Sequence, residues 1–280
     1  MNNYCNSCKN ITYTLFQDLI LNKYKVNYYQ CSHCNLIQTE NPYWLEESYS
    51  NTITLLDLGL LSRCILNVTR TESLLTQLIS LYNNNIRILD FAGGYGVYTR
   101  LMRDNGYNCY WQDDYCENIF AKDFIHKENS KYDMVTAFEV FEHEKDPNLL
   151  FKRLSLLSDN ILFSTLILPT KPLNETKDWW YFTPETGQHI TFYTTKSLEL
   201  LANKNGYNFY TNGTDLHFIS KNKLHSNPFF ISEKFSYTIL KKCFDFIIRT
   251  LYPSNKNSIR KSLLESDYLF VKNKINENRL

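Results

Sequence analysis

The segment that most constrains the fold of this chain is RILDFAGGYGVYTRLMRDNG, residues 87–106. Apolar residues lead to Asp90, three glycines follow in four positions (Gly93, Gly94 and Gly96), and apolar residues then recur at helical spacing. This pattern predicts a strand, a glycine turn and a helix. Glycine tolerates positive φ and lets backbone N–H groups at a helix N-terminus approach a ligand. We therefore expect a ligand site at this turn.

Strands and helices alternate on both sides of the turn. Residues 53–82 have the apolar density of helices, and the strand patterns after the turn cover 108–114, 120–126, 132–147 and 160–169. The pattern ends with a helix from Thr195 to Gly206 and a hairpin over 207–220 that turns at Asn212-Gly213. We predict an α/β fold with a doubly wound, mostly parallel seven-stranded sheet and a terminal antiparallel hairpin. In such sheets ligands bind beyond the carboxyl ends of the strands.

Four of the eight cysteines form two pairs, Cys5-x-x-Cys8 and Cys31-x-x-Cys34, with 22 residues between the pairs. Two such pairs can place four thiolates around a tetrahedral zinc ion, and the strand-forming residues between them suit the hairpin of a zinc ribbon. Unrelated CxxC pairs or redox thiols are the alternative. The sequence predicts a small zinc ribbon over residues 1–45, whose folding energy would come largely from the metal.

Composition indicates a globular chain of 280 residues, 43% hydrophobic, with a formal net charge of +1. The N-terminus lacks the apolar core of a signal peptide, and no uncharged apolar run approaches the ~20 residues of a membrane span. We therefore expect a cytoplasmic protein. The predicted order is the zinc ribbon, a helical lead-in over 46–84, the α/β domain over 85–223 and a helical extension over 224–280.

The residues that follow the predicted strands restrict the ligand. The run that starts at Gly94 has Thr99 where a dinucleotide-binding GxGxxG loop has its third glycine. Asp90 would repel a pyrophosphate, but it can help to hold a ligand that bears an amine or a sulfonium. Asp113, at the end of the second strand, can accept hydrogen bonds from a ribose diol. These residues disfavour NAD.

DFAGGYG resembles the first motif of class I S-adenosylmethionine-dependent methyltransferases, and YDMVTAFEVFEHEKDP resembles the segment around their fourth strand. The resemblance spans about residues 85–220. A cysteine-paired zinc module before such a domain is similar to the arrangement in sugar C-methyltransferases. Ala92 departs from the family pattern, which usually has glycine there, and we expect a modest backbone adjustment.

The resemblance implies that S-adenosylmethionine is the cofactor. Gly94 and Gly96 would line its methionyl part, and Asp113 would accept both ribose hydroxyls. The remaining cofactor contacts are predicted at Asp90, Gly93 and Glu139.

Two histidines are candidates for the base that a hydroxyl or carbon-acid acceptor requires. His143 follows the fourth strand, and His189 lies in a long insertion after the fifth strand. Glu142 and Glu139, three residues apart, are expected to orient these groups or the cofactor amine. His189 is slightly favoured because the insertion is the part expected to contact substrate. A hydrogen-bonded structural histidine is the alternative for each.

The insertion, KDWWYFTPETGQHITFY at 177–193, is predicted to hold the acceptor through Trp179, Trp180, Tyr181 and Gln188. Indole faces suit the C–H surfaces of sugars, and polar tips suit hydroxyls. We therefore expect a sugar or nucleotide-linked sugar, methylated on oxygen or carbon. Aromatic residues this dense can also be plain core.

The basic charge of the chain is concentrated at its C-terminus, where residues 221–280 contain 12 Lys and Arg but 5 Asp and Glu. Within this stretch 231–252 has the pattern of an amphipathic helix. Packing on the domain or on a partner subunit is the first expectation, and peripheral contact with an anionic membrane is the alternative.

The leading hypothesis is a methyltransferase that acts on a small molecule. An RNA methyltransferase with a zinc ribbon is disfavoured, because phosphate binding needs Lys and Arg and the ribbon has few, so no nucleic-acid partner is expected. A catalytically inert zinc-ribbon binding protein is disfavoured by the intact glycine loop and its acids. The sequence does not decide the oligomeric state.

Overall fold

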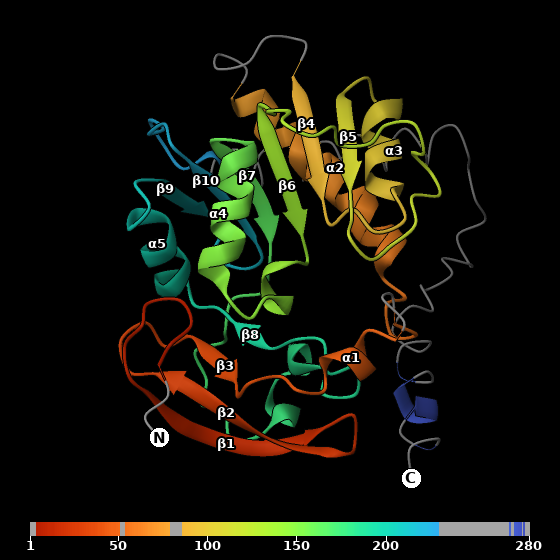
Figure 1. Ribbon diagram of the computed structural model, residues 1–280. Helices are drawn as coiled ribbons and strands as arrows, with labels where there is room; N and C mark the ends of the chain where they lie inside the picture. Colours follow the sequence, from red (N-terminus) through yellow and green to blue (C-terminus); the bar gives the residue numbers. More distant parts are fainter. Residues whose placement is uncertain are drawn as a thin grey trace, which may run out of the picture.

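The computed structural model describes residues 4–50, 54–78 and 86–229, with 269, 272–275 and 277 near the C-terminus. These residues build two sheets, one above the other in Figure 1. The segment 231–252, for which the sequence predicts an amphipathic helix, lies outside the described residues.

The larger sheet has the strand order β5-β4-β6-β7-β10-β9. Its strands are β4 (Arg87–Phe91), β5 (Asn108–Gln112), β6 (Met134–Phe138), β7 (Asn160–Ser164), β9 (Asn208–Thr211) and β10 (Leu216–Ser220). The first four are parallel, whereas β10 is antiparallel to both β7 and β9. The mostly parallel α/β sheet and its terminal hairpin are therefore confirmed.

The prediction of seven strands is wrong for the described residues, which place six strands in this sheet. Residues 120–126 were expected to form the missing strand, but they make only an isolated bridge between Ile125 and Trp111. Two backbone hydrogen bonds hold it, from Trp111 N to Phe124 O and from His126 N to Trp111 O. The exposed residues on both sides of this short apolar stretch end the pairing after one bridge.

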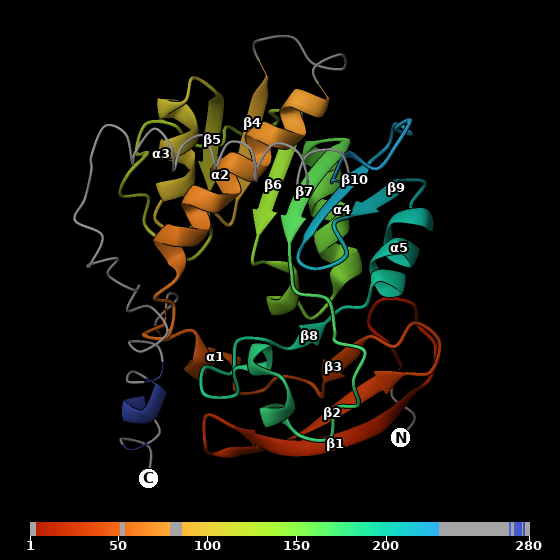
Figure 2. The same cartoon turned by 180° about the vertical axis from the view of Figure 1, so that it is seen from behind.

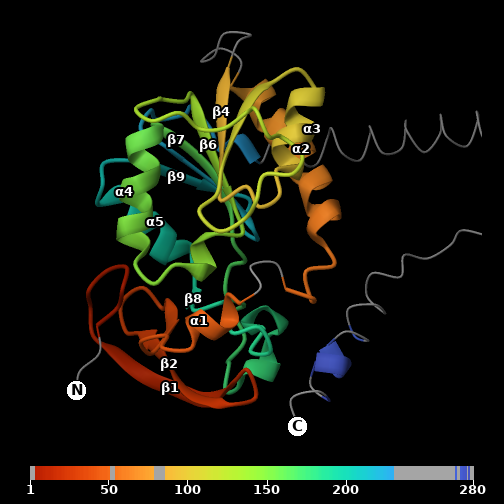
Figure 3. The same cartoon turned by 45° about the vertical axis from the view of Figure 1, so that its right-hand side comes forward.

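Helices cover both faces of the larger sheet, as Figure 3 shows. The helices α2 (Leu60–Gln77) and α3 (Val97–Asp104) pack on one face, and α4 (Pro147–Leu157) and α5 (Thr195–Asn203) pack on the other. Successive side chains of β4 point to opposite faces of the sheet and explain this division. Ile88 packs in the cluster that contains α2 and α3, and Leu89 packs in the cluster that contains α4 and α5. The predicted helix after Thr195 is confirmed, with Thr194 as its N-cap.

The smaller sheet is antiparallel and has the order β1-β2-β3-β8. Three of its strands come from the N-terminal part of the chain: β1 (Thr12–Ile20), β2 (Tyr24–Cys31) and β3 (Ile37–Thr39). The fourth, β8 (Thr191–Phe192), belongs to the insertion after β7. A short helix, α1 (Leu45–Ser48), follows this sheet and leads toward α2.

The N-terminal sheet and the insertion share one aromatic core. The ring centroids of Phe182 and Phe192, both in the insertion, lie 4.6 Å apart, and the ring of Tyr28 on β2 lies 5.4 Å from Phe182. Trp44 is almost fully buried in the same cluster, and its indole N–H donates to the Gly187 carbonyl. The N-terminal sheet therefore does not depend on its own few residues for a core.

The carboxyl ends of the parallel strands point toward the N-terminal sheet (Figures 1 and 2). Backbone hydrogen bonds connect the two regions: Thr39 N donates to Ile190 O, and Ile190 N donates to Glu142 O just after β6. The end of the sheet where ligands are expected is thus enclosed by the insertion. Among the described residues, no helix is long and apolar enough to cross a membrane.

We expect Phe192→Ala to lower the free energy of unfolding by ~3–5 kcal/mol, because it leaves a cavity in the core that the sheet and the insertion share. Phe120→Ala is the matched control, since Phe120 is 54% exposed. Urea denaturation of both variants measures the difference. An equal loss of stability in the two variants would contradict the shared core.

Candidate functional site

The glycine loop lies between β4 and α3, as the sequence predicts. Gly94 and Gly96 have positive φ, at 54° and 83°, and Gly96 caps the N-terminus of α3. A Cβ on Gly94 would meet no atom within 4 Å, so the loop faces open space at this position. A Cβ on Gly93 would lie 2.5 Å from a carboxylate oxygen of Asp90. The loop therefore needs glycine at Gly93 for close approach and at Gly94 and Gly96 for conformation.

Ala92 also adopts the left-handed conformation, with φ of 56°. Glycine would occupy this conformation without strain, whereas alanine pays about 1 kcal/mol. The departure from the family pattern at Ala92 is therefore accommodated by local strain, and the turn keeps its course.

Asp90 is buried directly beneath the loop, with 3% of its surface exposed. Its Oδ2 accepts a hydrogen bond of 2.8 Å from the Thr99 hydroxyl. Burial, opposed by the Thr99 hydrogen bond and helped by the charge of Asp113, raises the pKa of Asp90 to about 7. Near neutral pH this carboxyl is easily protonated or ionised, so a cation close to it would favour the ionised form.

Asp113 lies beside the loop at the end of β5. Its Oδ2 accepts a bond of 2.9 Å from Gly94 N, and its Oδ1 accepts from Tyr115 N and Cys116 N. These bonds orient the carboxylate at the mouth of the loop, and Oδ2 keeps a further lone pair for a ligand. The structure therefore brings Asp90, Asp113 and Gly94 together at one end of the sheet.

A second group of polar side chains follows β6. Glu139 has φ of 55°, so the expected helical face shared with Glu142 does not form. Instead the Ser164 hydroxyl donates to Glu139 Oε1 at 2.6 Å, and Glu142 lies in a 3-10 turn over Phe141–His143. The Tyr181 hydroxyl donates to Glu142 Oε1 at 2.7 Å. Burial raises the pKa of Glu142 to about 8, and the charge of Glu139 adds to the effect.

The structure brings the two candidate catalytic histidines into contact. The ring centroids of His143 and His189 are 4.8 Å apart and nearly perpendicular. His189 Nδ1 lies 2.7 Å from the Tyr181 carbonyl, which can only accept, so Nδ1 carries the proton and Nε2 keeps a lone pair. Burial lowers the pKa of His143 to about 4 and that of His189 to about 3. Both rings are therefore neutral at pH 7.

The four predicted acceptor contacts differ in exposure. Trp180 is 60% exposed, whereas Tyr181 is 2% exposed and faces Glu142. Trp179 is half-buried against the aromatic core, and Gln188 is buried with its amide donating to the Ser48 carbonyl. Much of the insertion is thus core, which was the alternative interpretation of its aromatic residues.

Three residues of the lead-in reach this site, and the sequence analysis missed them. The Tyr49 hydroxyl lies 3.1 Å from His143 Nδ1, and the Tyr49 ring stacks on Tyr115 with centroids 5.8 Å apart. Arg63 pairs with Asp57, and the charges of both residues act on the pKa of His143. No sequence pattern marks these residues, because only the folded path of the lead-in brings them here.

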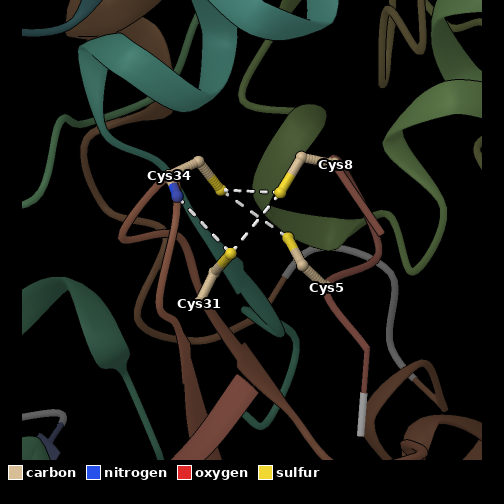
Figure 4. A group of neighbouring side chains, drawn as sticks. All are labelled: Cys5, Cys8, Cys31 and Cys34. Carbon is tan, nitrogen blue, oxygen red and sulfur yellow. Dashed lines mark hydrogen bonds between the residues drawn. The ribbon is translucent and has the colours of Figure 1, made fainter. Parts of the chain in front are cut away.

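The four N-terminal cysteines converge as predicted, and Figure 4 shows their sulfur atoms around a common centre. The Cys5–Cys34, Cys8–Cys31 and Cys8–Cys34 sulfur distances are 3.7, 3.4 and 3.5 Å. A disulfide needs ~2.05 Å, whereas four thiolates bound to tetrahedral zinc are ~3.8 Å apart. The backbone N–H of Cys34 also donates to Cys31 Sγ. This cluster has the donor set and spacing of a tetrathiolate metal site.

A family model described as a methyltransferase domain matches residues 68–212, just over half of the chain, including the glycine loop and both histidines. The chain belongs to this methyltransferase family. No curated protein sequence matches the chain.

Several solved structures are similar to this methyltransferase. Magnesium protoporphyrin IX methyltransferase from Synechocystis PCC 6803, with bound SAH, is 14% identical with a TM-score of 0.42, covering 63% of this chain and 92% of its own. CalO1, a methyltransferase in calicheamicin biosynthesis, is 12% identical with a TM-score of 0.39, covering 56% and 55%. WbdD is 12% identical with a TM-score of 0.38, covering 59% and 42%.

The loop geometry of the methyltransferase domain predicts unequal effects of alanine at adjacent glycines. Gly93→Ala pushes a methyl group into Asp90 and Trp111, so we expect a loss of ~1–3 kcal/mol in unfolding free energy and a changed near-ultraviolet circular dichroism spectrum. Gly94→Ala meets no neighbour and should cost only the ~1 kcal/mol of a left-handed alanine, with an unchanged spectrum. The opposite order in denaturation and spectra would show that the loop packs differently.

Proposed function

We propose that this protein is an S-adenosylmethionine-dependent methyltransferase with a small-molecule acceptor. The observation that carries the proposal is the buried Asp90 beneath a left-handed glycine loop, with Asp113 bonded to the loop amide of Gly94. Membership of the methyltransferase family supports the same conclusion.

The residues present suit this cofactor. Open space at Gly94 leaves room for the methionyl part, and Oδ2 of Asp113 keeps a lone pair for a ribose hydroxyl. The raised pKa values of Asp90 and Glu139 mark two buried carboxyls whose ionised forms a nearby positive charge would stabilise. When bound, S-adenosylmethionine supplies a methyl group that its sulfonium sulfur has already activated. The protein's task is then to bind, orient and exclude water.

The acceptor is assigned to the side of the site formed by His143 and His189. Neutral imidazoles and the Tyr49 hydroxyl offer hydrogen bonds to hydroxyl groups, and the exposed Trp180 offers an indole face. These features support a sugar or nucleotide-linked sugar as the acceptor, methylated on oxygen or carbon. His189 is the residue that activates the acceptor. Its Nδ1 donates to the Tyr181 carbonyl, so its Nε2 carries a lone pair.

Calorimetry with S-adenosylmethionine tests the cofactor assignment, and its pH dependence tests Asp90. The pKa of Asp90 is raised from 3.8 to about 7, and a bound cation requires the ionised form. We therefore expect affinity to be constant above about pH 8 and to fall by up to about tenfold per pH unit below about pH 7. Asp90→Asn should weaken binding and remove this dependence. The exposed Asp104→Asn should leave both unchanged.

Other titratable groups also lie near Asp90, and none of them changes the expected direction. The charge of Asp113 is included in the raised pKa, and the remaining neighbours are held neutral near pH 7 by pKa values raised through burial. They are Cys64, Tyr98 and Cys109. Affinity that stays constant from pH 6 to 8 would contradict the role of Asp90. Absence of binding would support the inert binding protein, and strongly salt-dependent acceptor binding would support RNA.

We also propose that Cys5, Cys8, Cys31 and Cys34 hold a structural zinc ion. Purified protein should contain about one zinc per chain at this cluster, and Cys31→Ser should release it and lower the melting temperature, because ligand binding and local folding are coupled. Cys64→Ser is the control, since Cys64 lies on α2, far along the chain from the cluster. Elemental analysis and thermal melting measure both effects. A metal-free protein with the melting curve of the zinc-loaded form would overturn the assignment.

A further inference from the structure

We propose that Glu142, His143 and His189 form a second metal site, for a divalent cation that binds the acceptor oxygen. The three side chains each offer a ligand atom, and these atoms all lie within 4.8 Å of one another. Neighbouring ligands of one cation at ~2.1 Å lie ~3.0–3.4 Å apart, so side-chain rotations that bring the three atoms closer would complete the site. The inference rests on the proposed methyltransferase function and specifies how its acceptor is held.

The hydrogen bonds of the two histidines are those of metal ligands. His189 donates from Nδ1 to the Tyr181 carbonyl, which leaves Nε2 free. The ring of His143 donates a hydrogen bond to the backbone of Gln188, and its Nδ1 faces the Tyr49 hydroxyl. Metal-bound histidines typically donate their second N–H to a carbonyl or carboxylate in this way. The Tyr49 hydroxyl is the group that the cation would displace.

Charge is the second observation that points to a cation. Glu142 is fully buried, accepts a hydrogen bond from Tyr181 at Oε1, and lies close to the Thr165 hydroxyl. Within the described residues its Oε2 makes no hydrogen bond of normal geometry. Glu139, which is partly buried, adds a second carboxyl whose charge acts on Glu142. The Asp57–Arg63 pair contributes no net charge. A divalent cation would bring a compensating positive charge to these two carboxyls and favour their ionised forms.

A cation at this position explains how a weakly acidic acceptor reacts. A cation held there would lower the pKa of a bound acceptor hydroxyl, since the metal stabilises the alkoxide, and the proton would pass to water before the bound cofactor excludes it from the site. The oxygen then forms a bond to the methyl carbon as the carbon–sulfur bond breaks, and the cofactor leaves as the neutral thioether. In this arrangement His189 activates the acceptor as a ligand and not as the proton acceptor.

The test is a titration of the zinc-loaded protein with Mn²⁺. The electron paramagnetic resonance signal of free Mn²⁺ measures how much has bound. Thiolates strongly prefer zinc, so Mn²⁺ reports the nitrogen and oxygen site and leaves the cysteine cluster occupied. We expect one Mn²⁺ per chain. His189→Ala should weaken its binding at least ~10-fold, and the exposed His225→Ala should not. His143→Gln is the second variant, and thermal melting identifies any that fails to fold.

The outcomes separate this inference from the proposed function. Folded His189→Ala and His143→Gln proteins that bind Mn²⁺ as the wild type does, or a wild type that binds none, overturn the metal site. Wild-type affinity for S-adenosylmethionine in the same variants shows that the cofactor site is intact, because neither histidine belongs to the glycine loop. Loss of cofactor binding in the wild type would instead contradict the methyltransferase function.

Discussion

The pairing of two short strands, β3 and β8, is the interaction on which the rest of the arrangement depends. Ile37 and Gln38 on β3 pair with Phe192 and Thr191 on β8, so the N-terminal sheet takes its last strand from the insertion. The second cysteine pair, Cys31 and Cys34, lies just before β3, and His189 lies two residues before β8. A few main-chain bonds therefore connect the cysteine cluster, the proposed zinc site, to the side of the methyltransferase domain where we propose that the acceptor binds. We infer that zinc, once bound, rigidifies the strand that positions His189.

Buried carboxyl groups distinguish the two ligand sides of the site. Asp90 lies beneath the glycine loop, and Glu139 and Glu142 lie after the neighbouring strand β6. The pKa values of all three are raised by burial, which means that folding alone leaves their charges poorly compensated. Such groups lower stability in the free protein and are typical of sites that bind a cation. The proposed sulfonium cofactor and divalent cation would supply this compensation at the two groups of carboxyls.

Backbone strain is concentrated at the same strand ends. Ala92 and Glu139, the residues just after β4 and β6, are both left-handed although neither is glycine. Each residue bends the chain sharply where a parallel strand leaves the sheet, and the bend at Glu139 directs its carboxyl toward Ser164. The surrounding sheet holds these conformations at a cost of ~1–3 kcal/mol each. The backbone conformations that place these strand ends therefore lower local stability.

The sequence by itself determined the α/β alternation, the glycine loop and the two cysteine pairs, because each follows from local spacing and backbone preference. It also indicated His143 and His189 as candidates. Only the tertiary structure decided that these histidines touch, and that the chain path around α1 and α2 brings Tyr49 and Arg63 to them. Contacts across 46 or more residues leave no periodic signal. The predicted seventh strand does not form, because pairing at the edge of a sheet depends on the neighbouring strand as well as on the segment's own propensity. The sequence of the segment alone does not report that neighbour.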